Sequence, residues 1–73
     1  MKYTLKVGVR GADSPEIFVN SLEAARGYIE SYGSDALYGL VIHTKTNEIV
    51  ACYNYDALTG RHFKADYLIE GGD

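Results

Sequence analysis

Apolar and polar residues alternate strictly at the start of the chain. The apolar positions are Tyr3, Leu5, Val7 and Val9, and the positions beside them are Lys2, Thr4, Lys6, Gly8 and Arg10. A period of two predicts a β-strand with one buried face and one wet, basic face. Residues 11–15 are rich in turn-forming residues and predict a loop. The short apolar run at residues 16–19 predicts a second strand, antiparallel to the first.

A helical pattern follows the second strand. The residues at helical spacing that predict the buried stripe are Leu22, Ala25, Ile29 and Tyr32, and Ala24 and Tyr28 widen this stripe. The residues predicted on the wet side are Glu23, Arg26 and Glu30. Arg26 is spaced to pair with either of these two acids. Either Asn20 or Ser21 can cap the helix, and Asn20 would place Glu23 where a capping box needs a carboxylate. Gly33 predicts the end of the helix, in the left-handed conformation. Gly27, inside the helix, indicates a place where a strand approaches closely.

The apolar stretch at residues 39–55 predicts a β-hairpin around which the rest of the chain is organised. Residues 40–44 and 49–55 are rich in β-branched and apolar side chains. The polar residues 45–48 between them have the chemistry of a turn. Residues 34–38 are predicted to connect the helix to this hairpin.

The sequence after the hairpin predicts one more strand. Thr59 and Gly60 are expected to reverse the chain. Beyond them the apolar positions Phe63, Ala65, Tyr67 and Ile69 alternate with Lys64, Asp66, Leu68 and Glu70. This alternation predicts a strand with Phe63 turned into the core, lying at an edge of the sheet.

Together these elements predict a single domain over residues 1–73, because a 73-residue chain has room for one thin core. The expected fold class is α+β: two layers, one helix packed on an antiparallel sheet of four to five strands, in the order β-β-α-β-β-β. The helix covers one face of the sheet and leaves the other open. Since apolar residues occur on both sides of the hairpin, we expect a second surface that meets a partner.

Composition and charge narrow the range of partners. Ten acidic and seven basic residues give a net charge of −3, which disfavours a partner held mainly by phosphate contacts. Cys52 is the single cysteine, so an internal disulfide is excluded and a reducing, cytoplasmic location is expected. No stretch approaches the roughly 18 apolar residues of a membrane helix, so we expect no membrane contact.

Three short motifs carry a resemblance to known domains. They are Ser21-Leu22-Glu23-Ala24-Ala25, then Leu40-Val41-Ile42-His43, then Glu48-Ile49. In these features residues 3–55 resemble a widespread group of small uncharacterised bacterial domains, in which a strand pair leads to an Ala-containing helix and a His-containing strand. The resemblance implies the fold and no activity. In size, acidity and compactness the chain is also similar to small phage-encoded inhibitors of host or defence proteins, anti-CRISPR proteins among them.

Few residues are candidates for catalysis or metal binding. His43, His62 and Cys52 are the only histidines and cysteine, and a structural zinc site usually needs four such ligands at characteristic spacing. Cys52 beside a histidine could form a nucleophile pair, but a lone cysteine in an apolar strand is usually a packed residue. The sequence has no phosphate-binding glycine loop, and a chain this short has little room for a pocket of about 300–1,000 Å³. We therefore expect no enzyme activity, no metal and no cofactor.

The sequence favours a non-enzymatic protein-binding module, with an inhibitor of phage or mobile-element type as the finer hypothesis. The chain has seven tyrosines, a residue enriched at interface hot spots. The predicted partner contacts are Tyr38, Tyr53 and Tyr55, rimmed by Asp35, Glu48 and Asp56. The alternative is weak nucleic-acid binding through Lys2, Lys6, Arg10, Arg61 and Lys64. Because the core is thin, we also expect a homodimer, formed by pairing of the last strand or by packing of open sheet faces.

Overall fold

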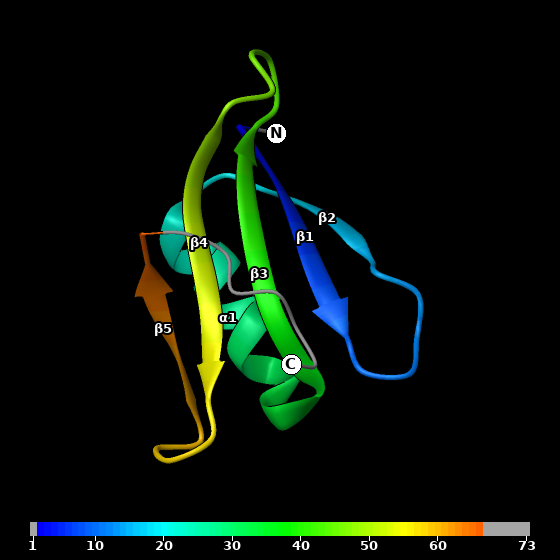
Figure 1. The fold of residues 1–73 in the computed structure, drawn as a ribbon. Helices are drawn as coiled ribbons and strands as arrows, with labels where there is room; N and C mark the ends of the chain where they lie inside the picture. Colours follow the sequence, from blue (N-terminus) through cyan, green and yellow to red (C-terminus); the bar gives the residue numbers. More distant parts are fainter. Residues whose placement is uncertain (1, 67–73) are drawn as a thin grey trace.

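The structure, a computed structural model, describes residues 2–66 and consists of one helix packed on a five-stranded antiparallel sheet (Figure 1). In chain order the elements are β1 (Tyr3–Val9), β2 (Glu16–Val19), α1 (Leu22–Ser31), the 3-10 helix η1 (Gly33–Asp35), β3 (Ala36–His43), β4 (Ile49–Asp56) and β5 (Arg61–Ala65). The strands lie in the order β2-β1-β3-β4-β5. The predicted two-layer α+β arrangement is confirmed. The order of elements differs from the predicted pattern, because η1 stands between α1 and β3.

The helix begins at the second of the two predicted caps. Ser21 is the N-cap, and its Oγ accepts a hydrogen bond from the Ala24 backbone N–H at 3.1 Å. Glu23 is therefore one position too early for a capping box, and the Asn20 side chain instead accepts from the Lys2 backbone N–H at 3.3 Å. Beyond the helix, Gly33 has the predicted positive φ, +61°. None of the helices within residues 2–66 is long and apolar enough to cross a membrane.

The hydrophobic core lies between α1 and the side of the sheet that we call the inner face. Its buried members include Leu5, Val7, Val19, Ala25, Ile29, Val41, Ala51 and Tyr53. The stripe predicted on the helix is narrower than expected, because Ala25 and Ile29 are buried whereas Ala24 and Tyr28 are exposed. The opposite side of the sheet, which we call the outer face, carries the basic side of β1, as the alternation predicts.

Two predicted elements differ from the observed strands. β3 begins at Ala36, so part of the predicted connection belongs to the sheet, because β1 is long enough to pair with it as far as Val9. β5 begins at Arg61 and presents the opposite face from the one predicted: His62 is 2% exposed and faces α1, whereas Phe63 is 42% exposed. The remainder of the predicted last strand, residues 67–69, lies outside the described residues.

Glycine allows the closest contact between the two layers. Gly39 in β3 lies directly under the helix, and a Cβ atom there would overlap with the side chain of Ile29. Gly27 was expected to admit a strand, but a Cβ atom at that position would meet no side chain or strand within 4 Å, so that prediction was wrong. The close approach is made by the glycine of the sheet, not the glycine of the helix.

These two glycines predict opposite effects of the same substitution. Gly39→Ala should lower the free energy of unfolding by about 1–3 kcal/mol, because the buried Ile29 has to move. Gly27→Ala should raise it by about 0.5–1 kcal/mol, because alanine restricts the unfolded chain and meets nothing in the folded one. Urea unfolding of the two variants measures both, and a change of the same sign in both would contradict this packing of α1 on β3.

Candidate functional site

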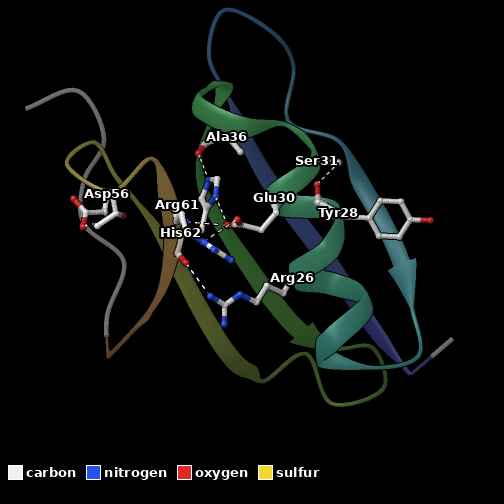
Figure 2. A network of polar contacts seen from close by, with 9 residues as sticks. Arg26, Tyr28, Glu30, Ser31, Ala36, Asp56, Arg61 and His62 are labelled. Carbon is white, nitrogen blue, oxygen red and sulfur yellow. Dashed lines mark hydrogen bonds and ion pairs between the residues drawn. The ribbon is translucent and has the colours of Figure 1, made fainter.

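A network of polar contacts joins α1 to the edge strand β5 (Figure 2). The ring of His62 lies between two oxygens: its Nδ1 is 2.8 Å from Glu30 Oε1, and its Nε2 is 2.6 Å from the backbone oxygen of Ala36. A carboxylate and a carbonyl can only accept hydrogen bonds. A ring with a proton on both nitrogens satisfies both oxygens, and in that form it is a cation beside a carboxylate.

The backbone of His62 is bound by the same helix. Its N–H donates to Glu30 Oε1 at 2.8 Å, and its carbonyl accepts from Arg26 Nη2 at 3.3 Å. In an antiparallel ladder alternate residues point their backbone groups away from the paired strand, so these groups of His62 lie on the free edge of β5. Side chains of α1 thus satisfy backbone groups that an edge strand would otherwise present to another strand. We call Arg26, Glu30, Arg61 and His62 the His62 cluster.

Arg61 and Tyr55 complete the surroundings of Glu30 and His62. Arg61 Nε is 3.8 Å from Glu30 Oε2, and the ring of Tyr55 packs against the His62 ring with centroids 5.2 Å apart. Burial alone would raise the pKa of Glu30, but hydrogen bonds from the backbone and ring of His62, with the charges of His62 and Arg61, outweigh it and lower the pKa. Glu30 is therefore held as a carboxylate. The prediction that Glu30 lies on the wet side of the helix, paired with Arg26, was wrong, because Glu30 binds His62 in β5.

This arrangement is suited to holding the fold together. A His62 ring that is 2% exposed has no path to a substrate. Cys52 cannot complete a nucleophile pair with either histidine, because it lies on the outer face, whereas His43 and His62 lie on the inner face. Within residues 2–66 no three His, Cys, Asp or Glu side chains are placed to hold a metal ion.

The predicted partner contacts do not form one surface. Tyr53 is 4% exposed and belongs to the core, and Tyr55 is also on the inner face, against His62. Tyr38 lies on the outer face, where its ring covers Gly8. The three acids are also dispersed, with Asp35 ending η1, Glu48 in the turn between β3 and β4, and Asp56 accepting hydrogen bonds from the Leu58 N–H and the Thr59 hydroxyl in the next turn.

The cations of the nucleic-acid alternative form two separate groups. Lys2, Lys6 and Arg10 are on or beside β1, whereas Arg61 and Lys64 are on β5. β3 and β4 lie between them, which corresponds to about 14 Å at the usual strand spacing. Lys6 is also 3.6 Å from Glu16 and Arg61 is near Glu30, so neither offers an unpaired charge.

Three exposed aromatic side chains were not among the predicted partner contacts: Tyr28, Phe18 and Phe63, which is described above. Tyr28 is 48% exposed on the flank of α1 away from β5, and with Ala24, Gly27 and Ser31 it lines a shallow groove of about 350 Å³. Phe18 is 55% exposed on β2. The alternation of Ile17 and Val19 about Phe18 could have indicated that Phe18 faces outward. The helical pattern gave no such signal for Tyr28, which simply lies beside the stripe.

No family model, no curated protein and no solved structure matches the chain.

The charge of Glu30 can be tested separately from its shape. Glu30→Gln should lower the free energy of unfolding at neutral pH by about 1–3 kcal/mol, because the part-buried carboxylate that accepts hydrogen bonds from the backbone and ring of His62 becomes a neutral amide. Glu23→Gln is the matched control, since Glu23 is exposed in the first turn of the same helix, and it should change stability by about 0.5 kcal/mol or less.

Comparison of the native protein with Glu30→Gln at different pH values tests the lowered pKa of Glu30. A carboxyl with a lower pKa in the folded chain stabilises it fully above the unfolded pKa, about 4.3, and loses that contribution as the pH falls through the folded pKa. Between about pH 5 and pH 3 the native protein should therefore lose more stability than Glu30→Gln does. Parallel stability curves for the two proteins over this range would contradict the assignment.

Proposed function

We propose that the chain is a non-enzymatic protein-binding module that uses the outer flank of α1. The observation that carries the proposal is the groove of about 350 Å³ beside the exposed Tyr28. Its other lining residues, Ala24, Gly27 and Ser31, are small, so a side chain of a partner can come close to the helix. An aromatic ring next to such a depression is typical of an interface hot spot.

The His62 cluster supports this choice of surface. On one flank of α1, Arg26 and Glu30 form hydrogen bonds to β5. Ala25 and Ile29 pack in the hydrophobic core. Tyr28 projects from the other flank, away from His62 (Figure 2). The groove thus lies on the flank of α1 that takes no part in these contacts with β5 and the core.

Net charge contributes little to the proposal. The full chain has ten acidic and seven basic residues, a net charge of only −3. A charge this small favours recognition by shape and apolar contact over attraction to a strongly basic site. The finer hypothesis, an inhibitor of a host or defence protein of phage or mobile-element type, is supported by small size and the overall acidity alone.

Affinity capture from a lysate of the native host tests the proposal. The immobilised full chain should retain a protein that the Tyr28→Gln and Ala24→Gln variants lose, because both substitutions alter the groove while keeping a residue that helices tolerate. Phe63→Gln is the matched control, since it also replaces an exposed aromatic residue, but on β5, and it should retain the same protein.

Two results would contradict the proposal: no protein retained above the bare support, or equal retention by all four proteins. The nucleic-acid alternative is discriminated by a gel shift on single- and double-stranded DNA and RNA. With its cations divided between β1 and β5, the chain should shift none of them at physiological salt. A shift that persists in that salt would favour the alternative.

A further inference from the structure

The two edges of the sheet are treated differently. On β5, Glu30 and Arg26 bind the outward N–H and carbonyl of His62. On β2 no such protection is found among residues 2–66, where the only bond to a side chain of that strand is the Lys6–Glu16 ion pair. An edge strand without protection offers its backbone groups to another strand.

The pairing of β1 shows which groups of β2 are free. The Val7 N–H donates to the Pro15 carbonyl at 3.3 Å, so the odd residues of β1 direct their backbone groups toward β2. Val19 and Ile17, which stand opposite Tyr3 and Leu5, receive those bonds. The backbone groups of Glu16 and Phe18 therefore point outward, at the free edge.

We infer that β2 pairs antiparallel with β2 of a second copy of this chain, about a two-fold axis through Phe18. In a continuous sheet the residues that stand opposite each other share a face. Phe18 then meets Phe18 of the second copy on the outer face, and Ile17 meets its Val19 on the inner face. Glu16 stands opposite Asn20, so no two like charges are opposed.

The competing arrangements are less favourable. An axis through Ile17 would set Glu16 opposite Phe18 of the second copy and bring the two Glu16 side chains closer along the strands. Pairing of β5 about Phe63, the edge predicted from the sequence, would set Lys64 opposite His62 and displace Glu30 and Arg26 from the His62 backbone. Like charges opposed across strands are destabilising, and the displaced side chains add a further loss.

The dimer goes beyond the proposed function, since no residue of β2 lines the α1 groove. A two-fold axis perpendicular to the sheet keeps both α1 helices on the same side of it. Because β2 has only four residues, the interface is small, and the association is expected to be weak and concentration-dependent.

Sedimentation equilibrium of the full chain tests the inference. The molar mass should rise from one chain toward two as the concentration reaches hundreds of micromolar. Phe18→Lys should raise the dissociation constant by about tenfold or more, because it brings two cations together at the axis. Phe63→Lys, an exposed aromatic residue on the outer face of the other edge strand, should leave the dissociation constant unchanged.

Amide exchange locates the interface directly. The Phe18 N–H should exchange more slowly as the concentration rises, while the Lys64 N–H on β5 should not change. A mass of one chain throughout the range would overturn the inference, as would a dimer that Phe18→Lys leaves intact or that Phe63→Lys disrupts. Thermal melts of both variants show whether they remain folded. Failure here leaves the capture experiment on α1 unaffected, because neither variant touches the groove.

Discussion

The position of α1 depends on a buried imidazole held between two oxygens. His62 sits in β5, its ring reaches Glu30 in α1 and the carbonyl of Ala36 at the start of β3, and its backbone binds Glu30 and Arg26. One residue thus connects three elements. Removing a partner would leave a buried cation or carboxylate uncompensated, and such a loss is large compared with the stability of a small domain.

This contact also determines which surfaces remain available. Because Arg26 and Glu30 are committed to one flank of the helix, Tyr28 and the groove occupy the other. The backbone of His62 is satisfied by α1, so the edge of β5 is protected at that residue, whereas no side chain within residues 2–66 protects β2 in this way. The contacts of α1 with β5 thus determine which flank of the helix is available, and they distinguish the two edges of the sheet.

Local patterns in the sequence predicted most of the fold. The alternation in β1, the cap at Ser21 or Asn20 and the stop at Gly33 each depend on neighbours a few residues apart, and each appears in the structure. The orientation of β5 was not predictable in this way. Phe63 looked like the core residue, but the long-range contact between His62 and Glu30, 32 residues apart, turns His62 inward and Phe63 out.

The candidate site was predicted less well than the fold. Residue type pointed to tyrosines, yet Tyr53 fills the core and Tyr55 packs on His62, because strand parity and burial decide exposure. Tyr28 lies at the margin of a helical stripe, where a small difference in helix rotation moves a side chain from the core to the surface. Sequence alone does not fix that rotation, whereas the contacts of Glu30 and Arg26 with β5 do.

Native-state amide exchange at His62 tests this account most directly. In the native protein the His62 N–H should exchange slowly, like the amides bonded between β3 and β4, although it lies on the free edge of β5. Glu30→Ala should make that amide exchange much faster while the amides of β3 and β4 stay protected, and Glu23→Ala should change neither. A His62 amide that exchanges in the native protein as fast as an unprotected one would contradict the fastening of α1 to β5.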